Sequence, residues 1–245
     1  MILITGDTHG DITRFKNPLI KKLKKNDSLI ICGDFGFIWN GSKKEKKLLK
    51  WIGKRRYNVL FVEGIHENYD ELEKYETEFW CGGLTRKISG NLRQLIRGNV
   101  FDLLDRRIFA FGGGRSEEND SYLEGADAEQ RWLREIPTDE ELKAADKALS
   151  QVGNKVDFVV SYEPPATISE FIRLGKTDRS HINTYLEHIK ETVDFGAWYF
   201  GRHHINKRIP SKYYALFDEV VPADSNKNDR RFQPDNIKEY NYGRI

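Results

Sequence analysis

The chain has 245 residues, of which 38% are hydrophobic and 32% charged, and its 40 basic side chains nearly balance its 38 acidic ones. This composition is polar for a globular protein but sufficient for a sizeable core, and the small net charge indicates no particular polyanionic partner. No apolar run approaches the length of a membrane span, and two cysteines exclude a disulfide framework, so we expect a cytoplasmic protein without a secretory signal.

Short apolar runs alternate with helical patterns along the chain. The predicted strands are Met1–Thr5, Ser28–Cys32, Val59–Glu63, Arg107–Phe111, Val156–Ser161, Ala197–Phe200 and Tyr213–Val221. Most are continuous apolar runs, as in strands that are covered on both faces. The predicted helices are Asp11–Lys25, Lys43–Arg56, Thr138–Gln151 and Ser180–Thr192, the third opening with a capping box of Thr138 and Glu141. This alternation predicts an α/β layered sandwich.

Basic residues cluster early in the chain, at Lys21–Lys25, Lys43–Lys50 and Lys54–Arg56. Because these stretches have helical patterns, we interpret them as solvated helix faces in preference to a nucleic-acid patch. The end of the chain is polar and charged throughout. We therefore expect one main domain over residues 1–221 and a tail over residues 222–245 that packs on it or is partly disordered.

Five short polar signatures follow five of the predicted strands. They are Gly6–Gly10, Gly33–Gly36, Gly64–Asn68, Ser161–Pro165 and Gly201–His204. Sites in open α/β sheets gather at the carboxyl ends of strands, so the five signatures are expected to converge. A single Asp or His in such a place is usually a turn or structural residue, but the order and placement of all five indicate a metal site. Asp and His donors suit Mn, Fe, Zn or similar divalent ions.

With these signatures the sequence resembles the calcineurin-like metallophosphoesterases, especially a bacterial and phage branch of small single-domain members. Further stretches carry the resemblance, which runs to about Val221: Trp80–Gly83, Leu95–Gly98, Ile108–Gly113, Trp198–Gly201 and Tyr214–Leu216. The resemblance implies a sandwich of mixed β-sheets flanked by helices, and hydrolysis of phosphoesters at two metals that share one aspartate. The second signature lacks the Asp-Arg-Gly continuation of the Ser/Thr protein phosphatases.

The resemblance assigns the first metal to four residues that this chain retains, Asp7, His9, Asp34 and His204. The three ligands that only the second metal uses are replaced by Ile65, Tyr162 and Arg202. Ile has no lone pair, Tyr binds only as a phenolate, and Arg stays protonated. The general acid of the family corresponds to His66, and Glu67 beside it is also as in the family. We expect one divalent metal per chain, with the second site weak or absent.

Two functions stay open. The first is a divergent one-metal phosphoesterase acting on a phosphate mono- or diester, in which His66 is the general acid and Arg202 supplies positive charge. The second is an impaired pseudo-phosphoesterase that binds a phosphorylated ligand, a nucleotide or a partner protein without turnover. In either case the expected partner is a phosphorylated small molecule or nucleotide, and neither a membrane nor nucleic acid.

Three further alternatives concern the signatures and their neighbours. One is that the acids and histidines form a metal-free structural cluster, although Asp7 and Asp34 would then repel one another. His203 is a candidate replacement ligand, but alternation along a strand would point it away from the metal beside His204. Arg115 follows three glycines after a predicted strand and is a candidate substrate-binding residue.

Overall fold

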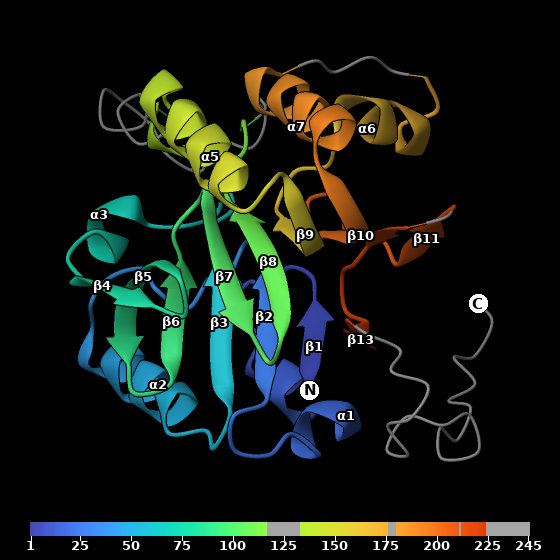
Figure 1. Cartoon of the computed structure of the whole chain (residues 1–245). Coiled ribbons are helices and arrows are strands. Elements are labelled where there is room, and N and C mark those ends of the chain that lie inside the picture. The colour runs from blue at the N-terminus through green and yellow to red at the C-terminus, as the bar shows by residue number, and fades with distance from the viewer. Residues whose placement is uncertain (117–132, 176–179, 211, 224–245) are drawn as a thin grey trace.

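A computed structural model describes residues 1–116, 133–175, 180–210 and 212–223. Two mixed β-sheets lie face to face in it, with helices packed around them (Figure 1). This arrangement confirms the predicted α/β sandwich. Among the described residues, no helix has both the length and the apolar character needed to cross a membrane.

The first sheet, sheet A, holds seven strands and carries the first three signatures. Its strands are, in spatial order, β13 (Val220–Pro222), β1 (Ile2–Thr5), β2 (Ser28–Cys32), β3 (Asn58–Val62), β6 (Leu92–Leu95), β5 (Gly83–Ser89) and β4 (Thr77–Trp80). The strands β1, β2, β3 and β6 run parallel to one another. The carboxyl ends of β1, β2 and β3 therefore meet at one edge of the sheet.

The second sheet, sheet B, holds six strands and carries the last two signatures. Its strands are β11 (Lys207–Ile209), β12 (Tyr213–Ala215), β10 (Asp194–Phe200), β9 (Lys155–Ser161), β8 (Arg106–Phe111) and β7 (Asn99–Leu103). The central strands β8, β9 and β10 are parallel. Their carboxyl ends also lie together, next to the corresponding edge of sheet A.

Three apolar layers hold the sandwich together. The layer between the sheets joins alternate residues of β1, β2 and β3, such as Ile4 and Leu60, to residues of sheet B such as Phe158 and Val160. A second layer lies between sheet A and α2, and includes Leu49 and Ile52. A third lies between sheet B and the helices α5 and α7. Both sheets are thus covered on two faces, which explains the continuous apolar strands.

The helices that lie wholly within the described residues include a 3₁₀ helix, η1 (Ile12–Lys16), and the α-helices α1 (Pro18–Lys21), α2 (Lys43–Gly53), α3 (Tyr69–Leu72), α5 (Asp139–Gln151), α6 (Ala166–Ile172) and α7 (His181–Thr192). The capping box of α5 is present, with Thr138 accepting from the amide of Glu141 and Glu141 accepting from the amide of Thr138. That prediction is confirmed.

Two predicted elements are wrong in extent. The helix predicted over Asp11–Lys25 is two short helices, because Asn17 before Pro18 is extended, with φ −53° and ψ 133°. A proline restricts the residue before it in this way. The strand predicted over Tyr213–Val221 is two strands, β12 in sheet B and β13 in sheet A. The chain crosses between the sheets there. The predicted tail lies almost wholly outside the described residues.

Candidate functional site

Four side chains meet where the carboxyl ends of β1, β2 and β10 come together. Each of Asp7, His9, Asp34 and His204 offers one donor atom, and the four atoms lie within 4.8 Å of one another. Nε2 of His204 lies 3.0 Å from Oδ2 of Asp7 and 3.0 Å from Nε2 of His9. Nε2 of His9 lies 3.8 Å from Oδ2 of Asp34. Sheet A supplies three members of this cluster and sheet B supplies His204.

The backbone around the cluster is tightly constrained. The φ angles of His9, Asp34 and His204 are 45°, 41° and 50°, in the left-handed region that non-glycine residues seldom occupy. The amides of Thr8 and His9 both donate to the carbonyl of Asp34, at 3.1 and 2.8 Å. These bonds join the loops after β1 and β2. Backbone strain of this kind persists where the surrounding structure fixes it, often at functional sites.

Two glycines make room for the carboxylates. A Cβ on Gly64 would lie 2.2 Å from Oδ1 of Asp34, and one on Gly201 would lie 2.0 Å from Oδ1 of Asp7. No side chain fits at either distance. The glycines of the third and fifth signatures therefore allow the backbone to pass against the two acids.

The carboxylate of Asp7 has no aligned hydrogen-bond donor among the described residues. It is buried, and neither oxygen accepts an aligned hydrogen bond, although Nε2 of His204 lies 3.0 Å from Oδ2. Burial raises the pKa of Asp7 to about 7, against the lowering effect of His204. The carboxylate in turn raises the pKa of His204. A buried acid without aligned donors, facing two imidazoles, suits a divalent cation.

The second acid is bonded to His66. The amide of His66 donates to Oδ1 of Asp34 at 2.8 Å, and its Nδ1 lies 2.9 Å from Oδ2. Burial by itself would raise the pKa of Asp34, but the hydrogen bonds and charge of His66 outweigh burial and hold it below its ordinary value. The ring of His66 lies 5.3 Å from that of His9. The residue that matches the family's general acid thus stands at the edge of the cluster.

Tyr162 fills space beside the same carboxylate. It is fully buried, and its hydroxyl donates to Oδ2 of Asp34 at 2.9 Å. Burial raises the pKa of Tyr162 well above its usual value, in keeping with a protonated phenol that donates to Asp34. A Cβ on Gly33 would lie 2.1 Å from the ring, and one on Gly114 would lie 3.0 Å from it.

Ile65 and Arg202 complete the replaced positions. Ile65 is buried, and a Cβ on Gly114 would lie 2.9 Å from its Cγ2, so it lies in the same layer as Tyr162. Nε of Arg202 donates to Oε1 of Glu163 at 3.0 Å. Its positive charge lowers the pKa of both Asp7 and Tyr162, although burial dominates each shift. The three positions that the family resemblance assigns to the second metal thus hold an apolar side chain, a phenol and a guanidinium.

The remaining candidates fall outside the cluster. His203 is not one of the four residues. The backbone turns at this point, since β10 ends at Phe200 and Arg202 and His204 have φ angles of 49° and 50°. Strand alternation does not apply there. The side chain of Arg115 is exposed, while its carbonyl accepts from Nη2 of Arg202 at 3.4 Å.

Two supporting residues escaped the sequence analysis. Arg14 is buried and donates to the carbonyl of Asp7 at 3.1 Å and to that of Phe217 at 2.6 Å. Glu163 orients Arg202, and its Oε2 accepts from Nδ2 of Asn183 at 3.3 Å. The position of Glu163 inside the fourth signature was a usable signal, whereas nothing local marks Arg14.

Comparison with known proteins identifies the family. The model for calcineurin-like phosphoesterases matches residues 1–219. The comparison with curated proteins finds no match. A similar solved structure is the protein of unknown function AQ665 from Aquifex aeolicus, with a TM-score of 0.36 and 12% identity over 80% of this chain and 87% of that one. Since the family model spans most of the sequence and both sheets, the chain belongs to the calcineurin-like phosphoesterases.

Proposed function

We propose that the chain hydrolyses a phosphate mono- or diester with one divalent metal, held by Asp7, His9, Asp34 and His204. The observation that carries the proposal is the buried carboxylate of Asp7, which accepts no aligned hydrogen bond and lies within a cluster of four donor atoms. Such an ion supplies Lewis-acid polarisation of the phosphate and activation of the attacking water. The metals that suit these donors are Mn, Fe, Zn or similar ions.

The protein's own groups take the other roles. Arg202 binds phosphate oxygens through its guanidinium, oriented by Glu163 at 3.0 Å. His66 transfers a proton to the leaving oxygen, a contribution of roughly 10²–10⁴-fold in rate. Its contact with Asp34 through Nδ1 orients the ring, and the imidazolium form of His66 donates the transferred proton from Nε2.

The second candidate function is binding of a phosphorylated ligand or nucleotide without turnover. The protonated Tyr162 favours it, because its hydroxyl occupies Oδ2 of Asp34, the shared carboxylate of the family. A guanidinium at position 202 stabilises anionic charge but does not ionise water. Binding and hydrolysis therefore use the same residues and differ only in whether the chemical step proceeds.

Hydrolysis of an aryl phosphodiester and an aryl phosphomonoester with added Mn²⁺ separates the two functions. The wild type is compared with His66→Ala and with Asp7→Ala, after circular dichroism has shown all three to be folded. We expect turnover in the wild type, a loss of about 10²-fold or more in His66→Ala, and loss of both metal and turnover in Asp7→Ala. A wild type no faster than His66→Ala, with metal bound, means a binding protein. Unchanged metal content in Asp7→Ala removes the metal-site assignment.

A further inference from the structure

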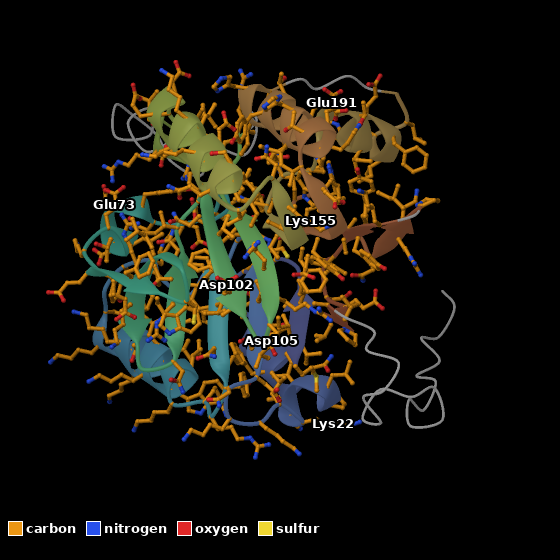
Figure 2. The ribbon with its side chains drawn as sticks, in the orientation of Figure 1. Lys22, Glu73, Asp102, Asp105, Lys155 and Glu191 are labelled. Carbon is orange, nitrogen blue, oxygen red and sulfur yellow. The ribbon has the colours of Figure 1, made fainter. Side chains whose placement is uncertain are left out.

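Positive charge is concentrated in one stretch of this chain. Residues 12–57 hold 14 lysines and arginines and 3 acidic residues, whereas the whole chain holds 40 and 38. This stretch contains α1, α2 and their connections, which lie together toward the end of the molecule where β1, β2 and β3 begin (Figure 1). Lys22, labelled in Figure 2, lies at that end. The molecule is therefore electrically asymmetric although its net charge is small.

The acidic residues of the stretch do not neutralise it. Asp34 belongs to the candidate site, and Asp27 pairs with the N-terminal amine. Glu45 accepts from the amides of Trp39, Asn40 and Gly41. Within the described part of the chain, no salt bridge involves a lysine between positions 21 and 54. The exposed lysines repel one another without compensating ion pairs, which an anionic partner would relieve.

The lysines of α2 form a row. Lys43, Lys47, Lys50 and Lys54 are spaced three or four residues apart and are all exposed, so they lie along one side of the helix. Eleven residues of helix span about 16 Å. The opposite side of α2, with Leu49 and Ile52, is buried on sheet A. A membrane-surface helix turns its apolar side outward to the lipid, and α2 does the reverse.

The segment before the row contacts the loop after β3, and the row ends at a cavity. At its start, Nδ2 of Asn68, in the loop that carries His66, donates to the carbonyl of Trp39 at 2.5 Å. At its end, a cavity of about 330 Å³ opens between α1 and the residues before β3. Its lining includes Phe15, Lys21, Lys54, Arg55 and Tyr57. This volume is within the roughly 300–1,000 Å³ of small-ligand pockets.

Aromatic side chains stand at both ends of the row. Trp51 is 43% exposed and Trp39 is 45% exposed. The guanidinium of Arg55 stacks on Trp51, 3.4 Å from the ring centroid, and its shielded Nε and Nη2 have no hydrogen-bond partner among the described residues. Cationic tracks with aromatic platforms are the usual means of holding single-stranded nucleic acid, by phosphate contacts and base stacking.

We propose that this face binds single-stranded nucleic acid, with the lysine row of α2 contacting backbone phosphates and the cavity beside Trp51 and Arg55 receiving a nucleotide. Of the two interpretations of the basic clusters, the structure thus favours the nucleic-acid patch, because folding brings separate clusters to one face around a cavity. The proposal is independent of whether the candidate site turns over, since the row lies outside the cluster of ligands.

Fluorescence anisotropy with a labelled deoxythymidine oligonucleotide of about 20 nucleotides tests this surface. The double variant K47Q/K50Q is compared with K143Q/K147Q, a pair of exposed lysines four residues apart on α5. We expect K47Q/K50Q to bind more weakly, with a slope of log affinity against log salt smaller by about 1.4, because each single-strand phosphate contact contributes about 0.7. K143Q/K147Q keeps the wild-type affinity and slope.

Trp51→Ala isolates the aromatic contribution. It is expected to lower the affinity about tenfold with an unchanged salt slope, since stacking of a base is not a charge contact. Equal losses in the two double variants, or no binding by the wild type at low salt, overturn the proposal. So does binding to phosphatidylserine vesicles that exceeds binding to the oligonucleotide and falls in K47Q/K50Q, which would identify a lipid surface as the partner.

Discussion

The hydroxyl of Tyr162 donates to the acid that the family uses as its shared ligand, at 2.9 Å. Its ring packs against Gly33 and Gly114, so it occupies the space on its own side of Oδ2 of Asp34. Because Tyr162 is a neutral donor, its hydrogen bond leaves Asp34 ionised, which agrees with the lowered pKa of Asp34. One residue thereby both fills the position and satisfies the carboxylate.

Restoring the family's ligands is expected to restore the second ion. The triple variant Ile65→Asn, Tyr162→His and Arg202→His replaces a side chain without lone pairs, a protonated phenol and a cation with three neutral donors. Its metal content, measured by atomic emission, should rise towards two per chain. Tyr162→Phe is the control, because its ring still fills the space, and it should stay at one. A triple variant that also stays at one shows that the positions were assigned wrongly.

Glu135 predicts a pH dependence of stability. It is 5% exposed, accepts from Oγ of Ser116 at 2.7 Å, and burial raises its pKa to about 7. Between its ordinary pKa of 4.5 and about 7 the folded chain keeps this proton and the unfolded chain loses it. The contribution of Glu135 to the unfolding free energy is therefore fully present at low pH. It falls by up to about 3 kcal/mol as pH rises through that window.

Glu135→Gln should remove that loss, because an amide does not ionise. In urea titrations from pH 4 to 8, the difference in unfolding free energy between variant and wild type should grow in favour of the variant as pH rises. The exposed Glu140→Gln should follow the wild type. A constant difference between Glu135→Gln and the wild type would contradict the prediction.

The site residues that the sequence made visible are those in short signatures directly after apolar strands. Asp7, His9 and Asp34 have this form, and the structure gathers them with His204. Arg14 was invisible because its partners, the carbonyls of Asp7 and Phe217, are backbone atoms up to 203 residues away in the chain. A backbone carbonyl leaves no mark in a sequence, so such a contact has to be found in three dimensions.

Among the elements, the short helix η1 connects two loops near the site through one arginine. Its Arg14 joins the loop after β1 to the loop between β12 and β13. Arg14→Gln is expected to lower the unfolding free energy by about 3 kcal/mol, since charged donors to buried carbonyls are lost, and to weaken metal binding through the loop of Asp7. Denaturant titration and metal titration measure the two effects.

The exposed Arg56 provides the matched control. It also donates to two carbonyls, those of Leu23 at 2.7 Å and Lys21 at 3.3 Å, but far from the cluster. Arg56→Gln should cost less stability and leave metal affinity unchanged. If both variants weaken metal binding equally, the contacts of Arg14 affect the metal only through general stability.

Sequence analysis missed the strands β4, β5, β6, β7 and β11. The first four hold mixed polar and apolar residues, and Phe79 and Leu84 are paired and exposed on β4 and β5. The antiparallel pair of β4 and β5 lies at the edge of sheet A, outside the part that is covered on both faces, so its composition resembles that of loops. The central parallel strands, covered on both faces, were predicted with their ends displaced by at most three residues, and Ser28–Cys32 was predicted with the observed bounds.

At the scale of the whole molecule, the proposed metal would join the two sheets. Asp7, His9 and Asp34 follow strands of sheet A, while His204 follows β10 of sheet B. An ion bound only by the folded chain stabilises it by about 2.7 kcal/mol at a hundredfold excess over Kd. For a chain of this size that is an increase in Tm of about 5–10 °C.

Thermal unfolding with Mn²⁺ and with EDTA measures this linkage. The wild type should unfold at the higher temperature in Mn²⁺, and Asp7→Ala should show no difference between the two conditions. The sequence alone did not predict this linkage, because the division of strands between two sheets depends on β12 and β13 crossing from one to the other. A wild type with equal Tm in both conditions would mean that the cluster does not bind the ion when folded.

The clearance around Tyr162 also couples substitutions at separate positions of the chain. A methyl group at position 33 would stand 2.1 Å from the ring, and one at position 114 would stand 3.0 Å from it. While Tyr162 keeps this position, a side chain at position 33 is therefore blocked, and one at position 114 requires the ring to shift. A smaller residue at position 162 would remove both restrictions, so the effects of substitutions at these three positions should not add.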